Sequence, residues 1–249
     1  MPEWSDPRPS GSPFAAATGA RTEAYDAGLR SYMLSVYNYM ASGVLLTGIV
    51  ALLFVQSGAV VSLFDAATGR PSILYWVVAL SPLAIILAMN AGMRRFSEMA
   101  MQGLYWGFAV LMGLSLSTLF VVYSPTAIAQ AFFATAAGFA GLSLWGYTTK
   151  RDLAPFGTFL IMGVVGLIVA MVINLFMQSS ALALGISAIG VLIFAGLTAY
   201  DTQKIKSTYS YVAGTDMQGK VAIHGALQLY LDFINMFLFI LRLFGSSRN

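Results

Sequence analysis

The sequence contains no cysteine, a single histidine and few charged residues. The absence of cysteine excludes disulfides, thiolate catalysis and metal sites built on cysteine. Zinc and iron sites usually recruit several imidazoles, so one histidine also argues against a zinc or iron enzyme. We therefore expect a protein that holds no cofactor.

Charged residues make up 9% of the 249 residues, against about 25% in a typical soluble domain. The formal net charge is +3, and the basic residues stand in short clusters rather than in one patch. We interpret these clusters as signals of membrane topology and expect no nucleic-acid partner.

Hydrophobic residues make up 58% of the chain. They concentrate in seven runs of about 20–25 residues, the length at which an α-helix crosses the bilayer core. The pattern predicts an all-α, polytopic integral membrane protein with seven transmembrane helices. Residues 1–30 are rich in Pro, Gly, Ser and Ala and predict a disordered cytoplasmic tail, which leaves residues 31–249 as the transmembrane domain. The predicted spans are approximately residues 32–56, 72–93, 99–123, 127–147, 156–177, 181–201 and 221–245.

Basic residues precede the first run and follow the second, fourth and sixth, whereas the links after the third and fifth runs carry none. The positive-inside rule then places the N-terminus and the basic loops on the cytoplasmic side. Seven complete crossings put the C-terminus outside, whereas a last segment that re-enters the membrane returns it to the cytoplasm. The basic residues concerned are Arg8, Arg21, Arg30, Arg94, Arg95, Lys150, Arg151, Lys204, Lys206 and Lys220. Because Arg242 and Arg248 lie near the C-terminus, the side of the membrane on which it lies stays open.

Small residues recur four positions apart in the third and fourth runs. The pairs are Gly113/Ser117, Ala134/Gly138 and Ala137/Gly141. Small residues at this spacing let membrane helices approach closely, so we expect helix contacts at all three pairs.

The last run carries an aspartate, Asp232, in its middle. A carboxylate there costs roughly 2.5–3.5 kcal/mol on insertion scales, so it should face protein or water rather than lipid. At about 100° per residue, most other polar side chains of the run share its face. We call this face the polar stripe and expect the other helices to wrap it; it consists of Asp232 with His224, Gln228, Asn235 and Arg242.

A second carboxyl, that of Asp201, lies near the end of the sixth run. The topology brings both aspartates into the same half of the membrane from adjacent helices. Two close carboxyl groups resist being ionised together, so the pair is expected to share a proton and to sense pH. In its ionised form the pair offers hard oxygen ligands for a cation such as calcium.

Structural interpretations of these residues stay open. Asp201 can be an interfacial residue or a cap, and Asp232 can pair with an arginine or with backbone donors. Arg94 and Arg95 can be topology anchors. Either arginine can instead reach Asp201 from the same membrane face and form a latch that protonation releases.

Three segments carry a family resemblance: GYTTKRDL at residues 146–153, YDTQKIK at 200–206 and LYLDFINMFLFILRLFG at 229–245. They strongly resemble the Bax-inhibitor family, also called the transmembrane BAX inhibitor motif proteins, and its bacterial members in particular. The similarity covers nearly everything after residue 25. The short end, SSRN, departs from the lysine-rich end of eukaryotic members that sense pH there, which argues against control through that tail.

The resemblance implies seven helices, with the last enclosed by the first six, in a bacterial inner membrane. It also implies a pH-sensitive calcium leak gated by Asp201 and Asp232, with Arg94 as the latch and Arg95 as its competitor. Calcium and protons are then permeant or transiently bound ions. The lipid bilayer is the expected environment of the protein.

Two other functions are considered. Intramembrane aspartyl proteases also place two aspartates on neighbouring helices, but their second aspartate follows Gly-x-Gly, whereas Leu229, Tyr230 and Leu231 precede Asp232 here. We therefore expect no enzyme. Some bacterial relatives modulate a membrane-anchored quality-control protease, and a flexible tail of residues 1–30 is what such a protease can grip. This partner role is compatible with the leak.

Overall fold

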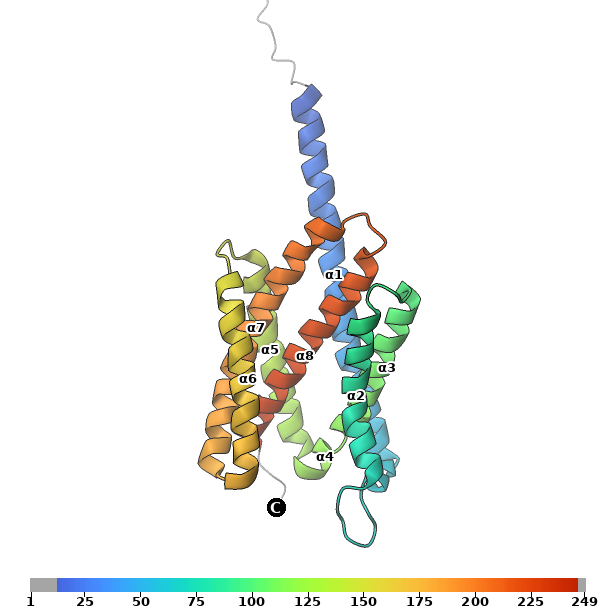
Figure 1. The fold of residues 1–249 in the computed structure, drawn as a ribbon, viewed down its shortest axis with the longest axis vertical. Coiled ribbons are helices and arrows are strands. Elements are labelled where there is room, and N and C mark those ends of the chain that lie inside the picture. The colour runs from blue at the N-terminus through green and yellow to red at the C-terminus, as the bar shows by residue number, and fades with distance from the viewer. Residues whose placement is uncertain (1–12, 246–249) are drawn as a thin grey trace, which may run out of the picture.

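The computed structural model describes residues 13–245, with the side chains from residue 23 onward. Long helices run up and down through one bundle (Figure 1). They are α1 (Pro13–Gln56), the short 3₁₀ helix η1 (Ala59–Leu63), α2 (Ile73–Gly92), α3 (Glu98–Leu116), α4 (Leu119–Val122), α5 (Pro125–Thr148), α6 (Ala154–Met177), α7 (Ser180–Val212) and α8 (Gln218–Phe244).

Seven helical segments in the described part of the chain are long and apolar enough to cross a membrane. The third of them is α3 continued by the short α4, and each of the seven overlaps one predicted run. Large apolar side chains on the outer helices are exposed, such as Phe159 (71%) and Phe176 (85%) of α6. Such a surface suits contact with acyl chains. The prediction of an all-α, polytopic integral membrane protein is confirmed.

Serine residues fix where four of the helices begin. The side chains of Ser72, Ser97, Ser124 and Ser179 each accept a hydrogen bond from the backbone N–H three residues later. This N-cap contact satisfies one of the donors that a helix start leaves without an intrahelical partner. Pro125 follows Ser124 in the first turn of α5, where proline's fixed φ suits a helix.

Two predicted boundaries differ from the structure. Helix α1 begins at Pro13, so the expected disordered tail of residues 1–30 is helical from that point, and residues 1–12 lie outside the described part. This N-terminal part of α1 extends beyond the other helices (Figure 1). The expected role of this tail as a grip for a protease stays a prediction. Helix α7 also continues past Asp201 to Val212, which is about three turns further than predicted.

Helix α8 lies at the centre of the bundle (Figure 1). Of the 18 residues in its most apolar stretch, 56% are buried. In the other spans of the described chain, the buried share of the corresponding stretch is 33% at most. It contacts α1, α3, α5 and α7, while α2 packs on α3 and α6 packs on α7. The expected enclosure of the last helix is thus provided mainly by four of the other six spans.

Helix α8 crosses the bundle without a break, and its end at Phe244 lies opposite the start of α1 (Figure 1). The last segment of the described chain is therefore one helix that spans the bundle and does not turn back, unlike a re-entrant segment. The turns that carry Arg94–Arg95 and Lys150–Arg151 lie at the same end of the bundle as the start of α8. We call this end the basic end.

The expected close packing at small residues is found at one pair of the three. A Cβ added to Gly113 of α3 would lie 2.7 Å from the backbone oxygen of Thr47 on α1, so this glycine permits a close approach. Gly138 and Gly141 of α5 have open space around the same position. The prediction was wrong for these two glycines, because spacing alone does not tell which face of a helix meets a neighbour.

Candidate functional site

Asp201 of α7 and Asp232 of α8 meet where these two helices pack against each other. Their carboxyl groups lie within hydrogen-bonding range of each other. Both side chains are buried, with 9% of Asp201 and 5% of Asp232 exposed. An ionised carboxylate only accepts hydrogen bonds, so a hydrogen bond between the two requires that one of them carries a proton.

Oδ2 of Asp232 is fully buried, and no N–H or hydroxyl group of the described chain donates a hydrogen bond to it. A buried carboxyl oxygen without a partner is costly, because it has lost water and gained nothing in return. A proton shared with the carboxyl group of Asp201 lowers this cost.

Lys204 is a positive charge close to the pair that the sequence-based latch hypothesis did not include. It lies one turn beyond Asp201 on the same face of α7, and its charge acts on both carboxyl groups. Its ammonium group is 5.9 Å from the centre of the Tyr200 ring, and the side chain is exposed. Lys204 is therefore a natural counter-ion for the ionised form of the pair.

Arg94 and Arg95 lie in the turn between α2 and α3, and both side chains are exposed. Among residues 23–245, neither arginine forms an ion pair or hydrogen bond with Asp201 or Asp232. This turn does lie beside the start of α8, since Lys220 Nζ donates a hydrogen bond to the carbonyl oxygen of Phe96 (3.3 Å). The structure thus brings the two aspartates together and leaves the expected latch unformed.

The polar stripe of α8 does not line one continuous polar site. His224 Nε2 is hydrogen-bonded to Oδ1 of Asn90 on α2 (2.7 Å), and Gln228 is half-buried. Further along, Nδ2 of Asn235 donates to the carbonyl oxygen of Leu231 in its own helix (2.8 Å). Arg242 lies exposed at the far end, 5.7 Å from the ring of Phe239. The members of the stripe therefore lie in separate environments.

A chain of hydroxyl groups leads from α1 to the residue beside Asp201. Thr202 Oγ1 donates to the carbonyl oxygen of Thr198 (2.7 Å) and lies 2.9 Å from Ser143 Oγ. Because a hydroxyl has one proton, Ser143 donates to Thr202, and Tyr37 in turn donates to Ser143 (2.8 Å). The order of donors is therefore fixed from Tyr37 towards α7, and α1, α5 and α7 are linked at the level of the pair.

The segment after Asp201 holds the turn between α5 and α6. Oε1 of Gln203 accepts from the backbone N–H of Leu153 (2.8 Å), and its Nε2 donates to the carbonyl oxygen of Arg151 (2.8 Å). Nζ of Lys206 donates to the carbonyl oxygen of Tyr147 (2.7 Å). Residues 200–206 and residues 146–153 are thus parts of one contact, which fixes the part of α7 that carries Asp201.

A second buried polar contact holds α8 beside α1 and α3. Thr47 Oγ1 donates to the carbonyl oxygen of Ala109 (2.8 Å) and lies 2.7 Å from the hydroxyl of Tyr230. Its one proton is used by Ala109, so Tyr230 is the donor to Thr47. This contact fixes α8 two residues before Asp232.

The site offers few ligands for a resident metal ion. Within the described residues there is no group of three or more His, Cys, Asp and Glu side chains that could hold one. Calcium usually takes six to eight oxygen ligands. Asp201 and Asp232 alone therefore supply fewer ligands than a calcium ion usually takes.

Comparison with known proteins decides the family. A model of the family described as "Inhibitor of apoptosis-promoting Bax1" matches residues 29–249. The chain belongs to the Bax-inhibitor family. It is similar to the inner membrane protein YbhL of Escherichia coli K12, with 42% identity over 224 residues that cover 89% of this chain and 94% of that protein.

Two further bacterial relatives match this Bax-inhibitor protein over nearly their whole length. The protein RP147 of Rickettsia prowazekii is 44% identical over 234 residues, 93% of this chain and 96% of its own. A protein of Caulobacter vibrioides is 45% identical over 228 residues, 90% of this chain and 91% of its own. The resemblance noted from the three sequence segments is therefore confirmed.

Reasoning from the sequence of this Bax-inhibitor protein missed several residues around the pair. Lys204 could have been found from its spacing of three from Asp201, which places both on one helical face. Gln203 stood within a recognised segment but had no predicted partner. No sequence signal pointed to Ser143 or to Tyr37, because ordinary Ser and Tyr residues in apolar helices are too common to single out.

Proposed function

We propose that this protein conducts a pH-sensitive calcium leak and that Asp201 and Asp232 are its gate. The observation that carries the proposal is the contact between two buried carboxyl groups from neighbouring helices. With one proton the two groups attract each other, and without it two negative charges repel each other in a poorly solvated site. The protonation state then favours either contact or separation of α7 and α8 at this level.

Separation of the two helices would give calcium a polar route at the middle of the bundle. The ionised pair would offer oxygen ligands to a cation that has lost part of its water shell. The fully buried Oδ2 of Asp232, to which no N–H or hydroxyl group of the described chain donates, supports this role. Calcium and protons would compete for the same oxygen atoms, which makes the leak sensitive to pH.

The latch of this proposal is a change of partner by Asp201. In the present arrangement its partner is Asp232, and in the latched arrangement it would be an arginine of the α2–α3 turn, Arg94 first and Arg95 second. A bistable element of this kind responds to a small change in charge. Lys204 would stabilise the ionised form in either arrangement.

We favour a gate over a catalytic dyad. The residues before Asp232 are bulky, and Leu229 and Tyr230 are fully buried. A peptide substrate would therefore have no room to lie against the carboxyl group from this side. The proposal accordingly treats the protein as a channel rather than an enzyme.

We place the leak in a bacterial inner membrane, because the similar protein YbhL of Escherichia coli is an inner membrane protein. The clusters at the basic end support an N-terminus on the cytoplasmic side by the positive-inside rule. An accessibility test with a membrane-impermeant reagent at single cysteines decides the orientation, because the natural sequence has no cysteine that would interfere.

The latch is tested by calcium flux into liposomes that contain purified protein. Arg94→Gln is expected to shift the pH midpoint of the flux more than Arg95→Gln does. Lys204→Gln is expected to move the midpoint to higher pH, because a nearby positive charge favours an ionised carboxylate. If both arginine variants keep the wild-type midpoint, the latch is wrong, while the gate itself stays open to test through the aspartates.

A further inference from the structure

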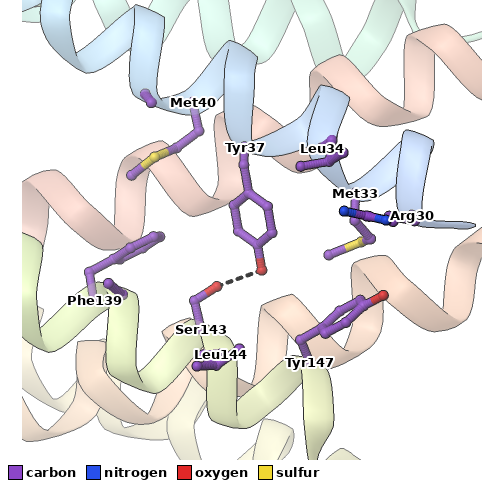
Figure 2. A pocket seen from close by; sticks show the side chains of 11 residues that line it. Arg30, Met33, Leu34, Tyr37, Met40, Phe139, Ser143, Leu144 and Tyr147 are labelled. Carbon is purple, nitrogen blue, oxygen red and sulfur yellow. Dashed lines mark hydrogen bonds between the residues drawn. The ribbon is translucent and has the colours of Figure 1, made fainter.

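A cavity of 690 Å³ lies between α1 and α5. Its volume is within the range of about 300–1,000 Å³ that small-molecule sites occupy. Figure 2 shows Tyr37 crossing this space with its hydroxyl directed at Ser143, to which it is hydrogen-bonded (2.8 Å). Both hydroxyl protons are used, because Tyr37 donates to Ser143 and Ser143 donates to Thr202. Met33, Met40 and Phe139 form apolar parts of the cavity wall. An occupant would therefore meet an apolar interior.

The cavity opens sideways between two membrane-spanning helices. Leu34 of α1 and Leu144 of α5 line it, and 51% and 63% of these side chains are exposed. At this depth the surroundings of the protein are acyl chains rather than water. An acyl chain from the bilayer can enter the cavity without leaving apolar surroundings. A water-soluble ligand would have to cross the acyl chains first.

One end of the cavity is basic. Arg30 and Tyr147 lie together at one end in Figure 2, and Met40 and Phe139 lie at the other. The ammonium group of Lys206 lies 4.9 Å from the centre of the Tyr147 ring, so a second cation adjoins this end. Arginine at the rim of a bilayer core extends its guanidinium towards the headgroups and binds phosphate oxygens well. The cavity thus combines an apolar interior with a cationic mouth.

We infer that this cavity binds an anionic phospholipid, with one acyl chain between α1 and α5 and the headgroup phosphate at Arg30. The charge of the mouth matches a lipid that carries a net negative charge, and the apolar wall matches its chain. A helix from a second copy is about 10 Å wide and would cover the opening without filling the space behind it. The binding is independent of whether calcium passes through the protein.

The test uses the full chain in phosphatidylcholine vesicles with a small fraction of photoreactive lipid. The probe is phosphatidylglycerol with a diazirine on one acyl chain, and the matched probe is phosphatidylcholine with the same chain. After irradiation, mass spectrometry locates the labelled residues. We expect the phosphatidylglycerol probe to label residues 30–41 and 139–147 several-fold more than the exposed face of α6.

Two variants block the cavity, and a third removes its charge. Ala140→Phe and Ala41→Phe place a ring at the rim, where both alanines line the cavity and are exposed. Ala137→Phe, also exposed on α5 and outside the cavity lining, is the matched control. Arg30→Gln removes the positive charge at the mouth of the cavity. Arg151→Gln removes an exposed positive charge at the same end of the bundle and is its control.

We expect each blocking variant to lower labelling in the cavity at least threefold and Ala137→Phe to leave it unchanged. Arg30→Gln should lower the preference for phosphatidylglycerol over phosphatidylcholine about fivefold, equivalent to about 1 kcal/mol, and Arg151→Gln should not. Equal labelling by the two probes in the wild type would overturn the inference. Labelling spread evenly over all exposed helices would do the same.

Discussion

Gly146 of α5 lies directly against the backbone of Ala199 of α7, two residues before Asp201. A Cβ on Gly146 would come within 2.9 Å of the Cα and carbonyl carbon of Ala199 and still closer to its oxygen. No side chain can move to relieve this contact, since the neighbour is backbone. The approach sets the depth at which α7 holds Asp201, so the position of the aspartate pair depends on a residue with no side chain.

Gly146→Ala is expected to destabilise the protein by about 1–3 kcal/mol, because the added methyl overpacks the contact between α5 and α7. Thermal unfolding of detergent-purified protein, followed by size exclusion, measures the loss. Gly141→Ala on the same helix is the control, since its added methyl points into open space. Alanine is the better helix former, so the control should match or exceed the wild type. Equal stability of the two variants would contradict the close approach.

Gln203→Ala is expected to loosen the turn between α5 and α6, because it removes both hydrogen bonds to Leu153 and Arg151. Each is worth about 1 kcal/mol net. Limited proteolysis with trypsin should therefore cut faster after Lys150 and Arg151. Cleavage after Arg94 and Arg95 in the other turn is the internal control and should not change.

Gln203→Glu refines this test, because it keeps an acceptor for the Leu153 N–H and loses the donor to Arg151. Its cleavage rate in the α5–α6 turn should fall between those of the wild type and Gln203→Ala. A rate equal to the wild type in both variants would show that Lys206 and the backbone hold the turn without Gln203.

The contact between Thr47 and Tyr230 predicts unequal costs for its two partners. Tyr230→Phe removes a donor and should cost about 0.5–1.5 kcal/mol, whereas Thr47→Val leaves a buried tyrosine hydroxyl without its acceptor and should cost about 1–3 kcal/mol. The double variant should cost less than the sum of the two, as residues in contact are coupled. Chemical unfolding of all four proteins measures the cycle, and strict additivity would argue against a hydrogen bond between them.

Much of the fold could be predicted from the sequence because crossing a bilayer imposes length and apolarity on each helix. All seven spans were found in this way. The errors lie where helices leave the apolar region: residues 202–212 are polar, so hydropathy ended the sixth span at Asp201 although α7 continues. The same reason hid the start of α1 at Pro13.

The candidate site was predictable in part. Topology and the family segments brought Asp201 and Asp232 together, and the structure places them in contact. The polar stripe was less informative, because a helical wheel gives the direction of a side chain but not what lies opposite. Asn235 shares the face of Asp232 and yet bonds to its own helix. Arg94 has the right position in the chain for a latch, and contacts of a flexible, exposed side chain cannot be deduced from position alone.

The central claim is tested most directly by calcium flux into liposomes that contain wild type, Asp201→Asn or Asp232→Asn. An asparagine cannot ionise, so each variant removes the shared proton while it keeps the size of the side chain. Asp152→Asn and Asp216→Asn, at exposed aspartates, are the matched controls. Between about pH 6 and pH 8 we predict that the flux of the wild type and of both controls changes with pH and that each gate variant loses this dependence. Wild-type flux at every pH in both gate variants would contradict the account.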